Sequence, residues 1–222
     1  MSENREPGVV AGTDPGQRPA SESHVPGESE LTELLTELLE NPEDWDQIVE
    51  RIDKIFTQTK ALMVLDMSGF SRTTLNRGIT TFLLMIHQMQ RLAVPSVKDN
   101  GGTLIKTEAD DLYCIFDTVP DALAAGREIA VRLETANLIL PKGRELYASI
   151  GIGYGPVLNI GNQDLWGSEM NHASKLGEDV ADKGEIILSE AAKEALGESV
   201  HRFEQRSLDL SGIDLNYYLL LS

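Results

Sequence analysis

Cysteine is almost absent from this chain, and so are the features of membrane and secreted proteins. Cys114 is the one cysteine in 222 residues, so a single chain can form neither a disulfide nor a cysteine-based zinc site. No apolar run approaches the roughly 18 residues that a transmembrane helix needs. The N-terminus lacks a basic start followed by an apolar segment, so we expect no signal peptide, no membrane insertion and a cytoplasmic location.

Basic residues are scarce as well. The chain has 19 Lys and Arg against 36 Asp and Glu, which gives a net charge of −17. Residues 1–50 hold 13 acids and 2 bases, so they carry −11 of that charge and leave −6 for the rest. We therefore expect no nucleic-acid partner, because long nucleic acid needs a basic track. The acidic charge still allows binding of a small nucleotide carried with a divalent cation, because the cation neutralises the phosphates and the site carboxylates.

Three segments are predicted along the chain. Residues 1–29 are rich in Pro, Gly, Ser and Glu without periodicity, which predicts a disordered leader. Residues 30–58 carry apolar side chains at helical spacing and predict a helical extension of two helices. These helices either pack on the main domain or act as a dimerisation or signal-input element. Residues 59–222 are long enough for one packed domain.

The main domain alternates strands and helices. We expect strands at 60–66, 103–107, 112–116, 146–153, 157–160 and 184–189, and two more within 201–221. We expect helices at 74–98, 121–136 and 168–181, and a short helix that follows the strand at 184–189 and ends at 196. Pro95 is expected to end or kink the first of these helices, Tyr154-Gly155-Pro156 to form a turn, and residues 161–167 to form a loop. The order predicts an α/β sandwich with a ferredoxin-like βαββαβ core and a C-terminal β-hairpin.

An acidic hairpin tip is predicted within residues 101–116. Glu108, Asp110 and Asp111 lie together at the tip, and Lys106 is a lone cation in an otherwise apolar strand. Hairpin tips are often acidic simply because they are solvated. We expect Glu108 and Asp111 to be solvated turn acids of this kind.

A second acid, Asp66, ends a buried strand and is followed by a turn. Gly69 in that turn allows close approach of the backbone, and free N–H groups at a following helix start favour phosphate oxygens. An acid beside such a turn is a common way to hold a metal ion over a phosphate. We therefore expect Ser68, Gly69 and Phe70 to contact a nucleotide.

Four short motifs occur in order along the chain. They are Asp66-Met67-Ser68-Gly69-Phe70, Gly101-Gly102 with Ile105-Lys106-Thr107 and Asp110, Gly151-Ile152-Gly153 with Gly155-Pro156-Val157, and Asp164-Leu165-Trp166-Gly167 with Asn171-His172-Ala173-Ser174. In this order and context they resemble the class III nucleotidyl cyclase catalytic domain. The resemblance covers about Ala61 to Leu221.

The resemblance implies conversion of a nucleoside triphosphate to a 3′,5′-cyclic monophosphate and pyrophosphate. It also implies two divalent cations, Mg²⁺ or Mn²⁺. Asp66 and Asp110 match the metal-binding pair of the family, and the Met67 carbonyl matches a further ligand. Two carboxylates suit this role because they can clamp the ions over the phosphates.

The resemblance also assigns the substrate-reading residues. Lys106 matches the position that contacts adenine N1, and Asp164 matches the partner that takes the exocyclic amine. This combination favours ATP over GTP, because guanine presents a carbonyl and an N–H at those places. Asn171 matches the residue that positions the ribose.

Three positions depart from the family pattern. Lys175 stands where the family has a transition-state arginine, and a lysine offers a point charge rather than a planar fork. Ser211 stands where the family has a phosphate-binding lysine, and Ala109 stands in place of a glycine. We expect Asn171 and Lys175 to be the catalytic residues, and the departures at Lys175 and Ser211 predict a slow enzyme.

The family works as head-to-tail dimers, so the resemblance implies a homodimer with two equivalent sites. Asp66 and Asp110 of one chain would face Lys106, Asp164 and the two catalytic residues of the other. Three hypotheses follow: an adenylate cyclase with low activity, an impaired cyclase-homology domain that acts as a nucleotide-binding or regulatory dimerisation module, and a purely structural dimer domain.

Overall fold

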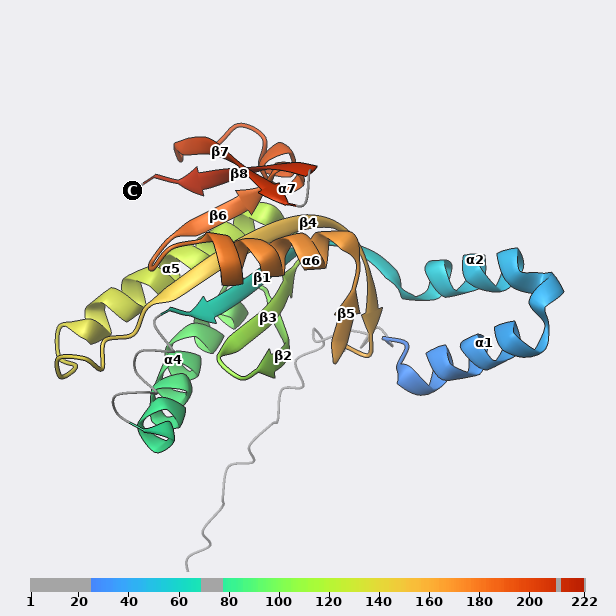
Figure 1. Cartoon of the computed structure of the whole chain (residues 1–222), viewed down its shortest axis with the longest axis horizontal. Coiled ribbons are helices and arrows are strands. Elements are labelled where there is room, and N and C mark those ends of the chain that lie inside the picture. The colour runs from blue at the N-terminus through green and yellow to red at the C-terminus, as the bar shows by residue number, and fades with distance from the viewer. Residues whose placement is uncertain (1–24, 69–77, 211–212, 222) are drawn as a thin grey trace, which may run out of the picture.

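The computed structural model describes residues 25–68, 78–210 and 213–221 (Figure 1). The strands are β1 (Thr57–Met67), β2 (Thr103–Glu108), β3 (Asp111–Phe116), β4 (Ala148–Ile160), β5 (Asp164–Trp166), β6 (Ile186–Ser189), β7 (Phe203–Leu210) and β8 (Ile213–Leu220). The helices are α1 (Glu28–Glu40), α2 (Trp45–Phe56), α4 (Ile79–Asp99), α5 (Val119–Asn137), α6 (Ser168–Ser174) and α7 (Glu190–Leu196), with a 3₁₀ turn η1 (Pro42–Asp44) and a π-helical segment η2 (Lys175–Val180).

The strands form one eight-stranded sheet. Its order is β2-β3-β1-β4-β6-β8-β7, and β5 pairs with β4 outside this path. The first four strands of the path are antiparallel neighbours, and α4 and α5 connect them in the chain order β1-α4-β2-β3-α5-β4. This is the predicted ferredoxin-like core, and the C-terminal β-hairpin predicted after it is β7 with β8.

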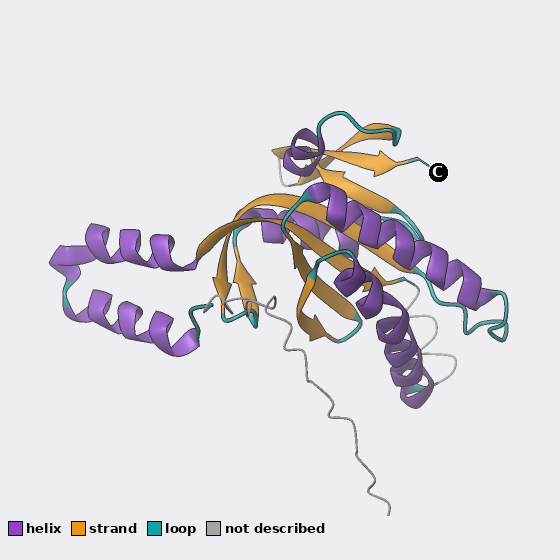
Figure 2. Cartoon of the chain, turned by 180° about the vertical axis from the view of Figure 1, so that it is seen from behind, coloured by secondary structure: helices purple, strands orange, loops and turns teal. Residues whose placement is uncertain are grey.

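Helices cover both faces of the sheet. On one face α4 and α5 lie side by side and bury the larger core, which includes Met63, Leu65 and Leu112 (Figure 2). On the other face α6 packs over a smaller cluster that includes Leu62 and Val64. Neighbouring residues of β1 thus face opposite layers, as the period of two in a strand requires.

The predicted break in the strand around residues 154–156 is wrong. β4 runs through this region without interruption and pairs with β1 from Ala148 to Leu158. The glycines there serve close packing instead, since a Cβ on Gly151 would lie 2.2 Å from the Ala173 carbonyl oxygen of α6. Pro156 is tolerated because β4 pairs there with β1 alone, between its contacts with β6 and β5.

Two further expectations are corrected. Of the two outcomes expected at Pro95, only the end of the helix is wrong, because α4 continues to Asp99 with Ala93 and Val97 buried in the core on either side of the proline. The loop predicted at 161–167 contains the short strand β5, which turns back onto the end of β4. The first part of the helix predicted at 74–98, residues 74–77, lies outside the described residues.

The N-terminal helices form a hairpin beside the end of the sheet (Figure 1). α1 and α2 bury a small cluster of their own, which they share with Ile160 of β4. This contact agrees with the packing alternative, while the signal-input alternative stays open. The division of the chain at residues 29 and 58 stays a prediction, and residues 1–24 lie outside the described residues. Within the described ranges, no helix is long and apolar enough to cross a membrane.

Candidate active site

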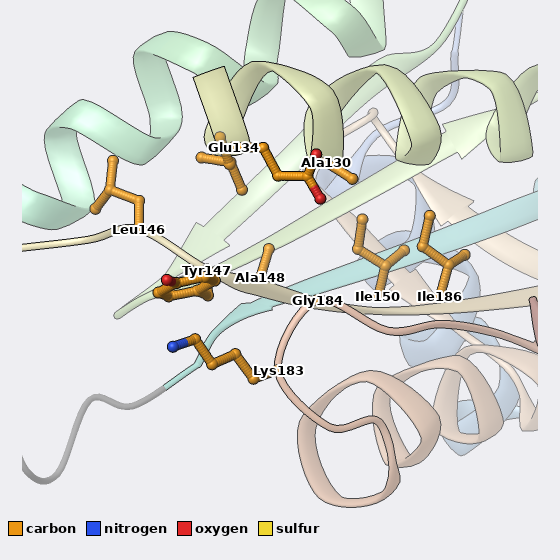
Figure 3. A pocket seen from close by; sticks show the side chains of 10 residues that line it. Ala130, Glu134, Leu146, Tyr147, Ala148, Ile150, Lys183, Gly184 and Ile186 are labelled. Atoms are coloured by element: carbon orange, nitrogen blue, oxygen red, sulfur yellow. The ribbon is translucent and has the colours of Figure 1, made fainter. Parts of the chain in front are cut away.

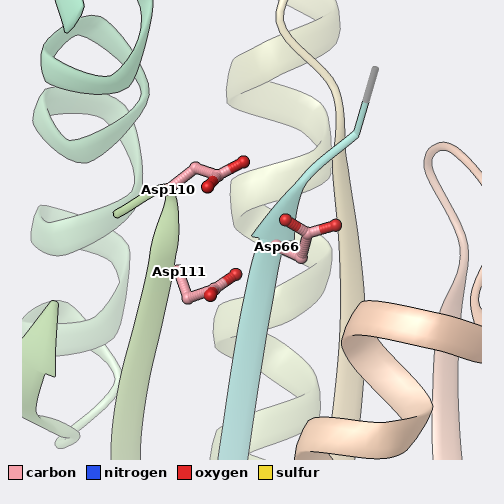
Figure 4. Close-up of side chains that lie close together, drawn as sticks. All are labelled: Asp66, Asp110 and Asp111. Carbon is pink, nitrogen blue, oxygen red and sulfur yellow. The ribbon is translucent and has the colours of Figure 1, made fainter. Parts of the chain in front are cut away.

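Three aspartates converge where β1 ends and the β2–β3 hairpin turns (Figure 4). Asp66 is the last residue but one of β1, Asp110 lies in the turn, and Asp111 begins β3. Each offers a carboxylate oxygen, and these oxygens all lie within 4.8 Å of one another. The structure therefore brings together the two predicted metal ligands, Asp66 and Asp110, and adds a third carboxylate.

The expectation that Asp111 is a solvated turn acid is wrong. β3 begins one residue earlier than predicted, so Asp111 is already a strand residue. Leu112 faces the larger core, and Asp111 therefore points to the opposite face together with Tyr113. Alternation along this strand was the signal that could have identified it. Glu108, by contrast, is largely exposed and its carboxylate lies 3.2 Å from the Lys106 ammonium.

The turn between the two strands has an unusual backbone. Ala109 has a φ of 50°, in the left-handed region that glycine adopts without steric cost. This conformation gives a physical reason for the glycine that the family pattern has at this position. Alanine accepts it at a cost of about 1 kcal/mol, and Asp110 next to it becomes buried, with 9% of its surface exposed.

Burial and mutual repulsion change the protonation of these carboxyls. The pKa of Asp66 rises from 3.8 to about 6, first because of burial and then because of the charge on Asp110. The pKa of Asp111 rises to about 8 through burial and the charges on Glu178 and Asp66. Burial also raises the pKa of Asp110. Without a cation, the cluster therefore holds protons close to neutral pH.

Three carboxylates suit a hard divalent cation. Oxygen ligands are what Mg²⁺, Mn²⁺ and Ca²⁺ prefer, and a cation would balance the negative charge that otherwise raises these pKa values. The donor set therefore fits the predicted cofactor in type, although it does not select one cation among these.

Two of the four residues predicted to follow Asp66 in the site, Met67 and Ser68, lie in the part of the chain that the structure describes. The Met67 side chain is buried, and its backbone N–H donates to the Asp66 carboxylate. The Ser68 N–H donates to the Tyr147 carbonyl over 2.9 Å, and the Ser68 hydroxyl lies 2.6 Å from that of Ser149. The Ser68 side chain is thus engaged with β4. Gly69 and Phe70 lie outside the described residues.

Lys106 and Asp164 meet across the space between β2 and β5. Lys106 Nζ lies 3.0 Å from Asp164 Oδ1 and 5.0 Å from the centre of the Tyr113 ring. Burial opposes the charge on Lys106, but hydrogen bonds to Asp164 and Glu108 outweigh burial and raise its pKa. Sequence reasoning predicted that these two residues act together, and the structure places them side by side.

A small cavity of about 210 Å³ joins this pair to α6. Asn171 and Ser174 of α6 line it together with Lys106, Asp164 and Trp166. The predicted base-reading and ribose-positioning residues therefore share one cavity. A larger hollow of about 780 Å³ shares the Lys106–Asp164 pair and extends towards α1.

Lys175 makes a local contact. It begins η2, and its ammonium forms an ion pair with Asp179 one turn later. Both side chains are well exposed, so such a pair contributes only about 0.3–0.5 kcal/mol. Ser211, the other departure from the family pattern, lies outside the described residues.

Sequence reasoning missed one more acid. Glu178 of η2 accepts a hydrogen bond of 3.1 Å from the Tyr113 hydroxyl, and its charge acts on Asp66 and Asp111. Glu178 is 67 residues from Asp111 in the chain, and only the packing of η2 against the sheet brings them close. No pattern in the sequence signals this contact.

A third cavity, of about 230 Å³, lies between α5 and the start of β4 (Figure 3). Its lining is mainly apolar, and Lys183 lies at its edge with Nζ 3.2 Å from the centre of the Tyr147 ring. The cavity contains none of the site residues predicted from the sequence.

Comparison with protein families matches most of the chain to a known family. A model described as the adenylate and guanylate cyclase catalytic domain matches residues 49–221. Among curated proteins, the serine/threonine-protein kinase pkn2 of Myxococcus xanthus is 25% identical over 134 residues. That alignment covers 60% of this chain and 16% of the kinase, so the chain spans only a small part of this relative's length.

Solved structures share the fold. An adenylate/guanylate cyclase/hydrolase from Silicibacter pomeroyi has a TM-score of 0.64 at 23% identity, over 75% of this chain and 98% of that one. The guanylyl cyclase Cya2 has a TM-score of 0.65 at 21% identity, over 74% and 92%. The adenylyl cyclase CyaB from P. aeruginosa has a TM-score of 0.60 at 21% identity, over 75% and 96%.

Proposed function

The chain belongs to the adenylate and guanylate cyclase catalytic domain family, and on this premise we propose that it converts ATP to 3′,5′-cyclic AMP and pyrophosphate. One observation carries the choice of ATP. A donor, Lys106, and an acceptor, Asp164, lie 3.0 Å apart on the wall of a cavity that Asn171 also lines.

The hydrogen-bonding pattern of this pair matches adenine. The Lys106 ammonium can only donate, which suits the N1 acceptor of adenine, and the Asp164 carboxylate can only accept, which suits the exocyclic amine. Guanine presents an N–H and a carbonyl at these places. It would leave both side chains facing a group of their own kind, and such unpaired polar groups reduce binding strongly.

The aspartate cluster supports the cyclisation chemistry. Asp66 and Asp110 would hold the divalent cations that the family uses, with the Met67 carbonyl as a further ligand. Ions held there would supply activation of the ribose 3′-oxygen and would stabilise negative charge on the phosphates. The positions of these aspartates determine where negative charge on the phosphates would be neutralised. Asn171 would orient the ribose.

A head-to-tail homodimer is part of the proposal. Within the described ranges, the aspartate cluster and the Lys106–Asp164 cavity are lined by different residues. A second chain would bring the cluster of one subunit to the cavity of the other, as in the dimers of the family. Two equivalent sites would result.

Lys175 favours a slow enzyme. It must give up its ion pair with Asp179 before it can meet a phosphate, and it cannot form the two parallel hydrogen bonds of an arginine. This observation also supports the second candidate function, a cyclase-homology domain that binds ATP or a partner without turnover.

The test is formation of cyclic AMP from ATP by the full chain with Mn²⁺ and with Mg²⁺. We expect product from the wild type and none from Asp66→Asn, which removes a metal-binding charge while keeping the shape. If a confirmed dimer forms no more product than Asp66→Asn, the cyclase proposal is wrong. Metal-dependent ATP binding measured by calorimetry would then support the second candidate.

Mixing two inactive variants tests the dimer. Asp66→Asn and Asn171→Ala each disable a different half of the site. In a head-to-tail heterodimer one site carries both defects and the other carries neither, so the mixture should regain activity. A mixture as inactive as its components would contradict the shared site.

A further inference from the structure

Asp111 is the feature of the site that the family resemblance did not assign. In the antiparallel pair of β1 and β3 the last register partners are Leu65 and Leu112, so Asp66 and Asp111 follow directly opposite each other. Both point to the face opposite Leu65 and Leu112. Figure 4 shows the two carboxyls side by side, with Asp110 above them.

Two ionised acids opposite each other on neighbouring strands are unfavourable, and either a proton shared between the Asp66 and Asp111 side chains or a bound cation relieves this repulsion. Like charges in such a pair destabilise a sheet. In the part of the chain that the structure describes, no lysine or arginine forms an ion pair with Asp66, Asp110 or Asp111. Lys175 of η2 is already paired with Asp179.

Asp110 gives an independent indication of a ligand. Its surface is only 9% exposed, and its own backbone N–H donates a hydrogen bond to its carboxylate. Figure 4 shows this carboxylate directed to the same space as those of Asp66 and Asp111. Burial of a carboxylate that no lysine or arginine of the described residues neutralises is costly, and a bound cation removes that cost.

We propose that Asp111 is a third carboxylate ligand, which lets a single chain hold a divalent cation before any nucleotide binds. This inference deepens the proposed function and rests on its metal site. Sites with one or two carboxylates usually complete the coordination of Mg²⁺ with substrate phosphates. A third carboxylate adds charge and a ligand from the protein itself, so the metal no longer depends on the nucleotide.

Glu178 strengthens the same tendency. Its carboxylate accepts a hydrogen bond of 3.1 Å from the Tyr113 hydroxyl, on the face of the sheet that carries Asp111. It adds negative charge beside the three ligands without being one of them. The order of loading in this chain is therefore metal first and nucleotide second.

Binding of Mn²⁺ to the full chain, without nucleotide, tests the inference. Free Mn²⁺ is measured by its electron paramagnetic resonance signal during titration of wild type, Asp111→Asn, Asp66→Asn and Asp117→Asn. Asp117 is the matched control, because it lies just beyond the other end of β3, its side chain is 80% exposed and it pairs with Lys60. Asp111→Asn should weaken Mn²⁺ binding about tenfold or more, since charge count sets affinity in such sites, and Asp117→Asn should leave it unchanged.

Folding is controlled in the same series. Asparagine has the shape of aspartate and removes one of two facing charges, so Asp111→Asn should be at least as heat-stable as the wild type in EDTA. If Asp111→Asn is less heat-stable than the wild type, Asp111→Ala serves as the second variant. Wild-type affinity in both folded variants would overturn the inference, and so would a wild type that binds no Mn²⁺ without nucleotide.

The outcome separates this inference from the cyclase proposal. Weaker Mn²⁺ binding in Asp111→Asn supports the inference even if the chain forms no cyclic AMP. Unchanged binding in Asp111→Asn, with binding lost in Asp66→Asn, overturns the inference and leaves the cyclase proposal intact. Unchanged binding in both variants shows that Mn²⁺ binds elsewhere on the metal-free chain and overturns the inference, and the cyclase proposal then stands or falls on formation of cyclic AMP.

Discussion

Raising the pH of the metal-free protein should destabilise it. Burial, followed by the charge on Asp110, raises the pKa of Asp66 to about 6. Burial and the charges on Glu178 and Asp66 raise the pKa of Asp111 to about 8. In the unfolded chain both groups return to about 3.8, so they lose their protons at a much lower pH.

The sign follows from proton binding. Between pH 4 and 8 the folded state holds protons that the unfolded state has lost, so the free energy of unfolding falls as the pH rises. The shift of Asp66 alone would correspond to about 3 kcal/mol if fully expressed. Because both carboxyls are only partly buried, solvent screening reduces the effect of the pair to about 1–2 kcal/mol. For a chain of this size that lowers Tm by about 5 °C between pH 5 and 8.

Thermal unfolding in EDTA at several pH values measures this effect. The wild type should show the fall in Tm, Asp111→Asn should show a much smaller one, and saturating Mn²⁺ should flatten the wild-type curve. The reasoning is refuted if the wild-type Tm stays constant or rises over this range. It is also refuted if Asp111→Asn falls by as much as the wild type.

Three further predictions concern the base pocket, the phosphate contact and the packing of β4. Lys106→Glu should lower turnover of ATP at least 100-fold or so and raise the preference for GTP in a competition assay, because the donor becomes an acceptor. Lys175→Arg should raise kcat about tenfold with little change in KM, and an unchanged kcat would show that Lys175 is not limiting. Gly151→Ala should lose more than about 2 kcal/mol in denaturant unfolding, since its Cβ would lie 2.2 Å from Ala173 O and 2.5 Å from Gly177 N. Wild-type stability would contradict that contact.

Local patterns were sufficient for the order of elements, whereas the pairing of Lys106 with Asp164 was implied by the resemblance to the cyclase family. Apolar alternation and helical spacing identified the ferredoxin-like core, because each element buries one face. The same reasoning failed at Gly155 and Pro156, which usually mark turns. There the reason for the glycines is the approach of α6, which no local pattern contains.

The acidic site shows the same division. Asp66 stands out because it ends a strand, and Asp110 was selected by the family resemblance, whereas Asp111 was assigned to the turn because the start of β3 was placed one residue late. An error of one residue at a strand boundary decides whether a side chain is placed in a solvated turn or on a face of the strand. Glu178 and the Lys175–Asp179 pair depend on the position of the π-helical segment, which the sequence predicted only as continuous helix.

The most direct measurement is the product formed when the dimeric chain receives equal amounts of ATP and GTP with Mn²⁺. Mass spectrometry separates the two cyclic products and shows both activity and base preference in one reaction. We expect cyclic AMP as the main product and its loss in Asp66→Asn. Cyclic GMP as the main product would contradict the reading of Lys106 and Asp164, and no cyclic product from either nucleotide would contradict the cyclase proposal itself.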